Sequence, residues 1–543
     1  SSTGRQRLYG VGGHCAAAGL DVAETWGHTG RVWMFLLVVA CSPEELKEPV
    51  DPVAIASCDD PDARLEARFD RRVFPGESAS EARFVGSGAA AADLDGDGVL
   101  DIVLAGPNDL RLLRSGADWA DDPDALPDLD WSQTAGATAA DADADGDLDL
   151  LITRYGPADR YLRNDGGVFV DASVEAGIVG ERFSTSSVWG DVDVDGDLDL
   201  IIAGHGLVEL DANGELSLSR ADSTALYLNN GDGTFEDATL TLPAEVHDGF
   251  TFVATLDDLD GDGRLDLFIA NDHPVYRTGL VAWGSPDGFQ VDNGSAGLSP
   301  YIAGMGVAVE DVDGDGLSDV LMSGWNRLVY LRSESGLWAD ATVAEGLVVP
   351  EGPEPQVGWG VEWGDLDNDG DLDALAGMGR LDTLNDLTAA GTSAANGEAQ
   401  RDLLFVHGDS GFAESGYTWG FEDTGATRGL VVADFDGNGW LDVLRRDLYG
   451  PITLDLARCG DASWLVVRPE AGVGAQVIVE AGPRRQTRRV RAGGTGLMTG
   501  GPPEVHFGLG AGGEPIEVQV RWPDGAVITQ DAEANTILSV ARP

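Results

Sequence analysis

Residues 93–101 read Asp-Leu-Asp-Gly-Asp-Gly-Val-Leu-Asp, and this stretch is the first of seven similar ones in the 543-residue chain. Each follows Asp-x-Asp-x-Asp/Asn-Gly-x-x-Asp, and the steps between successive starts are 48, 50, 67, 53, 54 and 69 residues. A motif at nearly regular spacing indicates a repeat architecture. The copies begin at Asp93, Asp141, Asp191, Asp258, Asp311, Asp365 and Asp434.

Each copy carries carboxylates at positions one, three, five and nine and a glycine at position six; Asn438 replaces one aspartate. So many anionic side chains repel one another unless a cation lies among them. Ca²⁺ prefers such hard oxygen ligands on flexible loops, and glycine permits the sharp turn. Asp-Gly pairs also form ordinary turns, but this does not explain aspartate at positions one, three and nine in every copy. The sequence predicts up to seven Ca²⁺ ions, held by Asp93, Asp95, Asp97 and Asp101; Asp141, Asp143, Asp145 and Asp149; Asp191, Asp193, Asp195 and Asp199; Asp258, Asp260, Asp262 and Asp266; Asp311, Asp313, Asp315 and Asp319; Asp365, Asp367, Asp369 and Asp373; and Asp434, Asp436, Asn438 and Asp442.

The surroundings of the loops differ from those of an EF-hand. An EF-hand needs a glutamate at position twelve and a helix on each side. Position twelve is apolar here, for example Leu104 and Ile152, and residues 198–203 and 265–270 are short apolar runs typical of buried strands. We therefore expect each loop to join two strands of a hairpin.

The sequence that follows the loops also repeats. Residues 160–173, 225–239 and 327–342 each predict a strand, a glycine-rich turn and another strand. Four antiparallel strands in about 40–50 residues correspond to one propeller blade. The sequence predicts an all-β fold with a seven-bladed β-propeller over 63–460. We expect residues 66–74 to supply the fourth strand of the last blade and so to join the ends of the ring.

These loops and strands resemble the FG-GAP/VCBS repeats of integrin-α-type propellers, which carry Ca²⁺ in the loop between the first two strands of a blade. The resemblance covers about residues 65–457. Every loop aspartate given above lies on a ligand position of that family.

Residues 461–543 lack the acidic loop and alternate apolar and polar residues, which predicts a small antiparallel β domain. The stretches 490–494, 506–510 and 518–525 resemble the ASPIC/UnbV domain. The order of the two parts resembles the cartilage-acidic-protein-like family, which is also found in bacteria and implies a secreted Ca²⁺-binding protein. A basic cluster in this domain could bind an anionic glycan, dock on the acidic propeller or form a solvated hairpin face; it comprises Arg484, Arg485, Arg488, Arg489 and Arg491.

The N-terminal residues predict export. Nine apolar residues, 32–40, are too few to span a bilayer but suit a signal-peptide core. Because Val-Val-Ala-Cys at 38–41 resembles a lipobox, we expect 1–41 to be a leader with lipidated Cys41 and 42–62 to be a tether. The alternative is an ordinary cleaved signal. Cys58 and Cys459 flank the propeller, so a disulfide between them is possible in an oxidising compartment.

The charge of the chain bounds its partners. The formal net charge is −60, and 43% of residues are hydrophobic, so a packed core is expected despite the acidity. Nucleic acid is disfavoured because binding it needs a basic surface. The only expected contact with a membrane is through the lipid anchor.

The sequence contains no Gly-x-Ser-x-Gly elbow, His-Glu-x-x-His motif or P-loop. Two functions remain. The first is a non-enzymatic adhesion or recognition protein, extracellular or attached to a bacterial envelope, with Ca²⁺ stabilising each blade and an extracellular protein or glycan as partner. The second is an extracellular enzyme, such as a polysaccharide hydrolase or lyase, with its site on the propeller face or in the central channel. Fold alone does not decide between them.

Overall fold

A computed structural model describes residues 69–74, 86–116, 119–210, 216–352, 355–380, 400–421, 424–448, 450–512 and 515–543. Almost all regular structure in them is β-strand, which confirms the predicted all-β class. All of them belong to one compact unit, Ala54–Pro543. None of the helices in this part of the chain is long and apolar enough to cross a membrane. The predicted leader, Cys41, the tether and Cys58 lie outside the described residues.

The repeat is a set of four antiparallel strands, with the acidic loop between the first and second. In the first unit these strands are β2 (Gly88–Ala92), β3 (Asp101–Ala105), β4 (Leu110–Arg114) and β5 (Ala120–Asp121). The later units pair in the same way. They are β6 (Thr134–Ala140), β7 (Asp149–Ala158), β8 (Arg160–Asn164) and β9 (Phe169–Asp171); β10 (Glu181–Gly190), β11 (Asp199–Gly204), β14 (Ala225–Asn229) and β15 (Phe235–Asp237); β16 (Thr251–Asp257), β17 (Asp266–Asn271), β18 (Leu280–Trp283) and β19 (Gln290–Val291); β20 (Gly304–Glu310), β21 (Asp319–Gly324), β22 (Arg327–Glu334) and β23 (Leu337–Asp340); β24 (Gly358–Gly364), β25 (Asp373–Met378), β27 (Leu403–Gly408) and β28 (Gly411–Glu414); and β30 (Thr427–Ala433), β31 (Asp442–Asp447) and β32 (Ile452–Ala457) with β1 (Phe69–Phe74).

The elements outside these units are short. The hairpin of β12 (Gly206–Leu210) and β13 (Leu216–Ala221) is inserted after β11, and β26 (Gln400–Arg401) pairs with β29 (Thr424–Gly425). The helical turns are α1 (Ser173–Ala176), η2 (Thr239–Thr241), η3 (Ala244–His247) and α3 (Gly416–Trp419).

The first strands of the units lie side by side in a closed order, β2, β6, β10, β16, β20, β24, β30 and again β2. Small residues such as those of β2, Gly-Ala-Ala-Ala-Ala, suit this crowded position. The architecture is therefore propeller-like. Pairing of Glu181 with Ala158 and of Phe183 with Tyr155 joins the second and third units into one sheet. The predicted number of seven separate blades thus stays a prediction.

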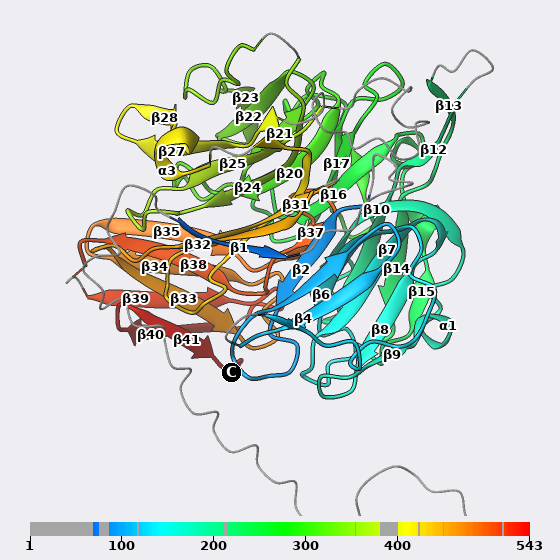
Figure 1. The fold of residues 1–543 in the computed structure, drawn as a ribbon, viewed down its shortest axis with the longest axis horizontal. Helices are drawn as coiled ribbons and strands as arrows, with labels where there is room; N and C mark the ends of the chain where they lie inside the picture. Colours follow the sequence, from blue (N-terminus) through cyan, green and yellow to red (C-terminus); the bar gives the residue numbers. More distant parts are fainter. Residues whose placement is uncertain are drawn as a thin grey trace, which may run out of the picture. The chain divides into compact units, whose positions relative to one another are not determined.

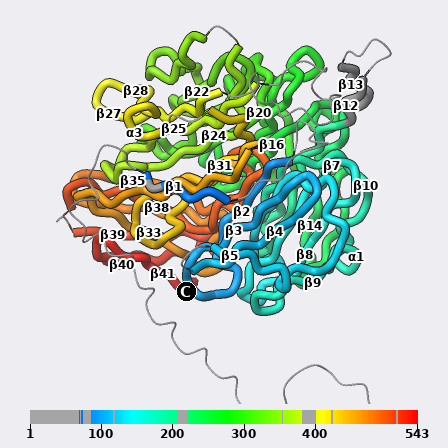
Figure 2. Tube along the Cα trace, viewed as in Figure 1, coloured from blue at the N-terminus to red at the C-terminus, as the bar shows by residue number. Residues whose placement is uncertain are grey.

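The two ends of the repeat region meet in one sheet. β1 pairs antiparallel with β32, from Phe69 opposite Ala457 to Phe74 opposite Ile452. The blue β1 lies beside the orange strands of the last unit, at the edge of their sheet (Figures 1 and 2). The Arg71 side chain donates to Asp455 at 2.6 Å. The predicted closure by the N-terminal strand is confirmed.

The C-terminal domain is built from two sheets around the buried side chains of Leu465, Val477, Phe507 and Val518. One departure from the predicted antiparallel domain is the parallel pairing of the first and last strands. One sheet has the order β38-β33-β41 and the other β35-β34-β39-β40. The strands are β33 (Ser463–Pro469), β34 (Gln476–Ala481), β35 (Arg484–Arg489), β38 (Val505–Gly510), β39 (Ile516–Arg521), β40 (Val527–Ala532) and β41 (Thr536–Val540).

The chain between β35 and β38 leaves this domain and enters the ring of first strands. Its β36 (Ala492–Gly493) pairs with β10, and its β37 (Thr499–Gly500) pairs with β2. Gly496 bridges to Val307 of β20. Figure 1 labels β37 beside β2, amid the repeat units. We call residues 490–501 the plug, because strands from the first, third and fifth units all bind it.

The plug is packed as core. Leu497 is 0% and Met498 2% exposed, and they belong to one cluster with Phe252, Val307 and Trp359 of the repeat units. The Met498 amide donates to the Ser186 hydroxyl at 3.0 Å. The plug therefore shares a hydrophobic core with the repeat region, while the two sheets of the C-terminal domain enclose a core of their own.

Candidate calcium loops and the domain that contacts them

The acidic loops share one backbone geometry. The first aspartate accepts a hydrogen bond from the glycine amide at position six: Gly98 donates to Asp93 at 2.9 Å and Gly439 to Asp434 at 2.8 Å. Gly98 and Gly439 have φ of 90° and 82°, a left-handed conformation that favours glycine. The glycine thus folds the loop back onto its first carboxylate.

Position five forms a second turn. Its side-chain oxygen accepts from the amide two residues later, as from Val99 to Asp97 at 2.9 Å. Asn438 keeps this bond, because its Oδ1 accepts from Trp440 at 2.8 Å while its Nδ2 donates to the Ala457 carbonyl at 3.0 Å. Asparagine therefore leaves an oxygen where the other loops have a carboxylate.

The gathered oxygens fit a hard cation. Ligand atoms of positions one, three and five lie within 4.8 Å of one another in the loops that begin at Asp93, Asp141, Asp258 and Asp311. In the third loop the grouped residues are Asp191, Asp193 and Asp199. Buried Oδ1 atoms of Asp93, Asp258 and Asp311 have no hydrogen-bond partner, although a buried oxygen normally needs one. An oxygen-only set with free lone pairs suits Ca²⁺.

Position nine has a structural role that the sequence pattern did not predict. Asp149 is 0% exposed, and its carboxylate accepts from the amides of Ala142 at 3.2 Å and Asn164 at 2.8 Å and from the Tyr161 hydroxyl at 2.6 Å. In all seven loops the position-nine carboxylate accepts from two backbone amides, that of position two and one within a residue of the end of the third strand. Position nine therefore ties its loop to the sheet.

Burial perturbs these carboxyls strongly. Burial raises the pKa of Asp149 to about 7 and that of Asp266 to about 8. Burial, with repulsion from neighbouring aspartates, raises the pKa of Asp365 to about 7 and of Asp434 to about 8. Each such carboxyl is partly protonated at neutral pH, so Ca²⁺ would displace protons on binding.

The C-terminal domain docks on the end of the repeat region that carries the loops. Arg491 lies 2.6 Å from Glu310 and also pairs with the fully buried Asp257. Arg489 lies 3.5 Å from Asp258, the first ligand of the fourth loop. Arg485 instead pairs with Glu480 of its own domain and is 49% exposed. Of the uses predicted for the basic cluster, docking on the acidic propeller is the one that Arg489 and Arg491 have.

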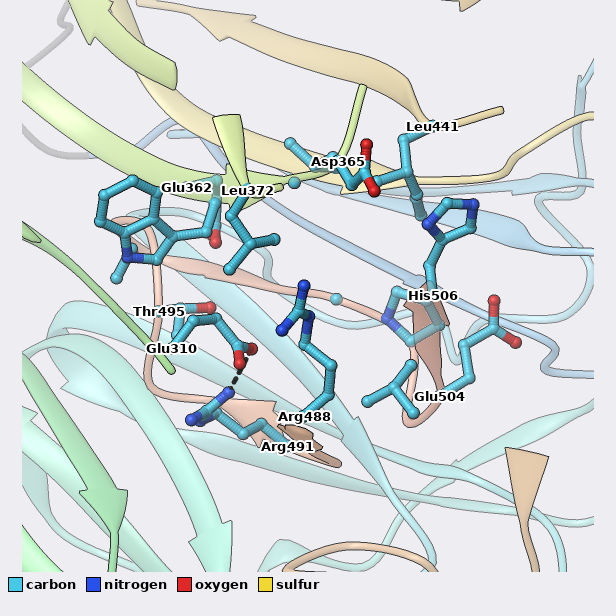
Figure 3. Close-up of a pocket in the computed structure, with 18 of the residues that line it drawn as sticks. Glu310, Glu362, Asp365, Leu372, Leu441, Arg488, Arg491, Thr495, Glu504 and His506 are labelled. Atoms are coloured by element: carbon cyan, nitrogen blue, oxygen red, sulfur yellow. Dashed lines mark hydrogen bonds and ion pairs between the residues drawn. The ribbon is translucent and has the colours of Figure 1, made fainter. Parts of the chain in front are cut away.

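A polar cavity of about 140 Å³ remains between the domain and the fifth, sixth and seventh units. Its lining includes Glu310, Glu362, Arg488, Thr495 and His506. Arg488 extends into it (Figure 3), and burial raises the pKa of Glu362 well above its usual range. A polar space of this size holds several water molecules.

The structure describes one of the two cysteines of the predicted disulfide. Cys459 is disulfide-bonded. Its predicted partner, Cys58, lies outside the described residues, as does Cys41. The pairing and the lipid anchor therefore stay predictions.

Comparison with protein families identifies both parts of the chain. Residues 468–543 match the family described as ASPIC and UnbV. Residues 93–152, 258–322 and 311–376 match the FG-GAP-like repeat. These matches bear out the resemblance drawn from the loops and the C-terminal stretches.

Cartilage acidic protein 1 is a curated relative. The Homo sapiens protein is 30% identical over 274 residues, which cover 47% of this chain and 39% of that protein. The Xenopus tropicalis protein is 26% identical over 352 residues, which cover 61% of this chain and 52% of that protein. The chain thus spans about half the length of these relatives or less.

Two solved structures align with most of the chain at low similarity. An Agrocybe aegerita lectin, described as recognising non-reducing terminal N-acetylglucosamine, has a TM-score of 0.35 and 18% identity and covers 67% of this chain and 86% of its own. BBS1N in complex with ARL6DN has a TM-score of 0.41 and 8% identity and covers 72% and 98%.

Proposed function

We propose that this chain, which joins FG-GAP-like repeats to an ASPIC and UnbV domain and is homologous to cartilage acidic protein 1, is a calcium-binding, non-enzymatic recognition module outside the cell. The observation that carries the proposal is the repeated loop, with its clustered carboxylates and unpaired buried oxygens. Ca²⁺ would neutralise each cluster and fix each hairpin. Attachment to the envelope through Cys41 is part of the proposal.

The end of the repeat region away from the loops is the proposed recognition surface. Connections between second and third strands leave from that end, because the acidic loops occupy the other. Tyr276 follows β17 and Trp325 follows β21, and Tyr301 precedes β20; they are 63%, 48% and 64% exposed. Exposed aromatic side chains supply area and a polar atom for binding a protein or glycan.

The plug supports recognition over the enzyme alternative. Leu497 and Met498 pack among the first strands, and so occupy the central channel, which is one of the two places considered for a catalytic site. An active site on the exposed end would still need a substrate and measurable turnover, so a substrate screen separates the two functions.

The test begins with metal. Native mass spectrometry should count up to seven Ca²⁺ per chain, and chelation should lower the melting temperature. Each site filled at a hundred times its dissociation constant adds about 2.7 kcal/mol to the free energy of unfolding. Ca²⁺-free protein with an unchanged melting temperature in EGTA would contradict calcium binding.

Recognition is tested on arrays of extracellular proteins and glycans. Tyr276→Ala with Trp325→Ala should abolish a Ca²⁺-dependent signal. Leu337→Ala is the matched control, because Leu337 is 59% exposed but begins β23 beside the turn that follows Glu334, at the end of the unit that carries the loops. Turnover of a bound glycan would favour the enzyme instead.

A further inference from the structure

The calcium loops differ in how far they face solvent. In the first five, positions four and five are exposed, as at Ala144 and Asp145. In the sixth loop position four, Asn368, is 0% exposed, and in the seventh loop position five, Asn438, is 5% exposed. The sixth and seventh loops are therefore enclosed, whereas the tips of the others are open.

One strand of the C-terminal domain covers both enclosed loops. The Gly510 amide of β38 donates to the Asn368 carbonyl at 2.7 Å. Four residues earlier on the same strand, His506 Nε2 lies 3.1 Å from the Gly439 carbonyl oxygen of the seventh loop. Between these bonds, a Cβ on Gly508 would collide with Asp365 and Asn368. β38 thus lies in direct contact with the loop backbones.

The enclosed loops also contact each other. Asn368 Nδ2 donates to the Gly439 carbonyl at 3.0 Å, so this one oxygen joins the sixth loop, the seventh loop and β38. The Trp464 ring of β33 leaves no room for a Cβ at Gly439. A cation in either loop would have the domain, not water, over the loop tip.

The remaining loops lack such a cover. Arg468 donates to the Gly98 carbonyl of the first loop at 3.0 Å, and Arg489 reaches Asp258 of the fourth, yet the tips of both loops stay exposed. The tips of the second and third loops are exposed as well.

β38 cannot move alone. Gln486 of the neighbouring sheet donates to the Gly508 carbonyl at 2.7 Å, and the plug that precedes β38 is buried in the ring. Uncovering the sixth and seventh loops therefore requires a local opening of the domain, which is rarer than loop motion in solvent.

We propose that the C-terminal domain divides the calcium sites into two classes: enclosed sites in the sixth and seventh loops, which exchange Ca²⁺ only when β38 moves away, and open sites in the first five. The division rests on the proposed function, because the loops must bind Ca²⁺. Extracellular Ca²⁺ would then set the occupancy of the open sites while the enclosed ions persist and hold the domain in place.

The experiment is rapid mixing of the Ca²⁺-loaded full chain with excess fluorescent chelator. We expect two release phases with amplitudes near five to two, the smaller at least about tenfold slower because it waits for local opening. Asp193→Ala, at position three of an open loop, should remove about one fifth of the fast amplitude. Asp367→Ala, at the same position of an enclosed loop, should remove about half of the slow one.

The role of β38 as the cover is tested by substituting Gly508. Gly508→Ala should accelerate the slow phase and leave the fast phase unchanged. Gly501→Ala is the matched control, because a Cβ there meets nothing within 4 Å. Circular dichroism establishes that each variant is folded, and His506→Ala, which removes one bond to the seventh loop, should accelerate the slow phase if Gly508→Ala does not fold.

The outcomes separate the two proposals. A chain that binds no Ca²⁺ contradicts the proposed function. Bound Ca²⁺ released in a single phase, or a slow phase that survives Asp367→Ala and Gly508→Ala in full, overturns the two classes while leaving calcium binding intact.

Discussion

His506 donates from Nε2 to the carbonyl oxygen of Gly439 across 3.1 Å, and this bond ties the C-terminal domain to the seventh acidic loop. The carbonyl can only accept, so the proton lies on Nε2. The buried Nδ1 has no hydrogen-bond partner. A second proton on this ring would create a buried positive charge, and its Nδ1–H would have no hydrogen-bond acceptor.

The first prediction concerns acid. Burial lowers the pKa of His506 to about 4 from 6.5, opposed in part by the bond to Gly439. Between these values the unfolded chain binds a proton that the native ring does not, so stability is lost as pH falls from 6.5 towards 4. We expect His506→Gln, which keeps an N–H donor but does not titrate, to lose up to roughly 3 kcal/mol less free energy of unfolding over this pH range than the wild type. Urea unfolding at pH 7 and pH 4.5 in saturating Ca²⁺ measures it, and identical losses in both proteins would contradict it.

The second prediction separates the two roles of the loop aspartates. Asp149→Asn should cost about 2–4 kcal/mol with or without Ca²⁺, because an amide replaces a buried carboxylate that accepts three hydrogen bonds. Asp145→Asn should cost stability only in Ca²⁺, since Asn438 already occupies the equivalent position. Denaturant unfolding in Ca²⁺ and in EGTA gives both numbers. Equal costs in EGTA would mean that position nine is no more structural than position five.

The third prediction concerns the plug. Leu497→Ala removes a side chain that is 0% exposed and should cost about 2–5 kcal/mol. Because this residue shares a core with the repeat units, we expect one transition in which tryptophan fluorescence and circular dichroism change together. Leu240→Ala is the control, at 96% exposed. A C-terminal domain that unfolded separately in the wild type would show that the core is not shared.

The fourth prediction compares two arginines of the basic cluster, Arg485 and Arg491. Arg491→Ala should cost about 3–5 kcal/mol, because it leaves the 0% exposed Asp257 without this cation. Arg485→Ala, half exposed beside Glu480, should cost less than about 1 kcal/mol. Thermal unfolding of both variants and the wild type at one Ca²⁺ concentration measures the two losses of stability. Equal costs would assign the cluster to the solvated face considered above.

Much of the fold was predictable because its information is local. Nine residues fix the loop chemistry, and the period of the loops sets the order of the strands. Residues 66–74 were expected to close the ring because they resemble a fourth strand of a blade, and pairing of β1 with β32 bears this out. The ASPIC/UnbV stretches likewise identified the C-terminal domain before any packing was known.

The relations that only the tertiary structure decided join residues far apart in the chain. The glycine-rich run at 492–501 has no apolar period to predict its burial, yet three distant strands supply partners for its backbone. Asp149 looked like one ligand among four until the amides of Ala142 and Asn164 were found on its oxygens. The loop sequence by itself determined that seven acidic sites exist. Which of them are enclosed depends on where β38 docks, because seven loops with nearly one sequence can differ only in what the rest of the chain packs against them.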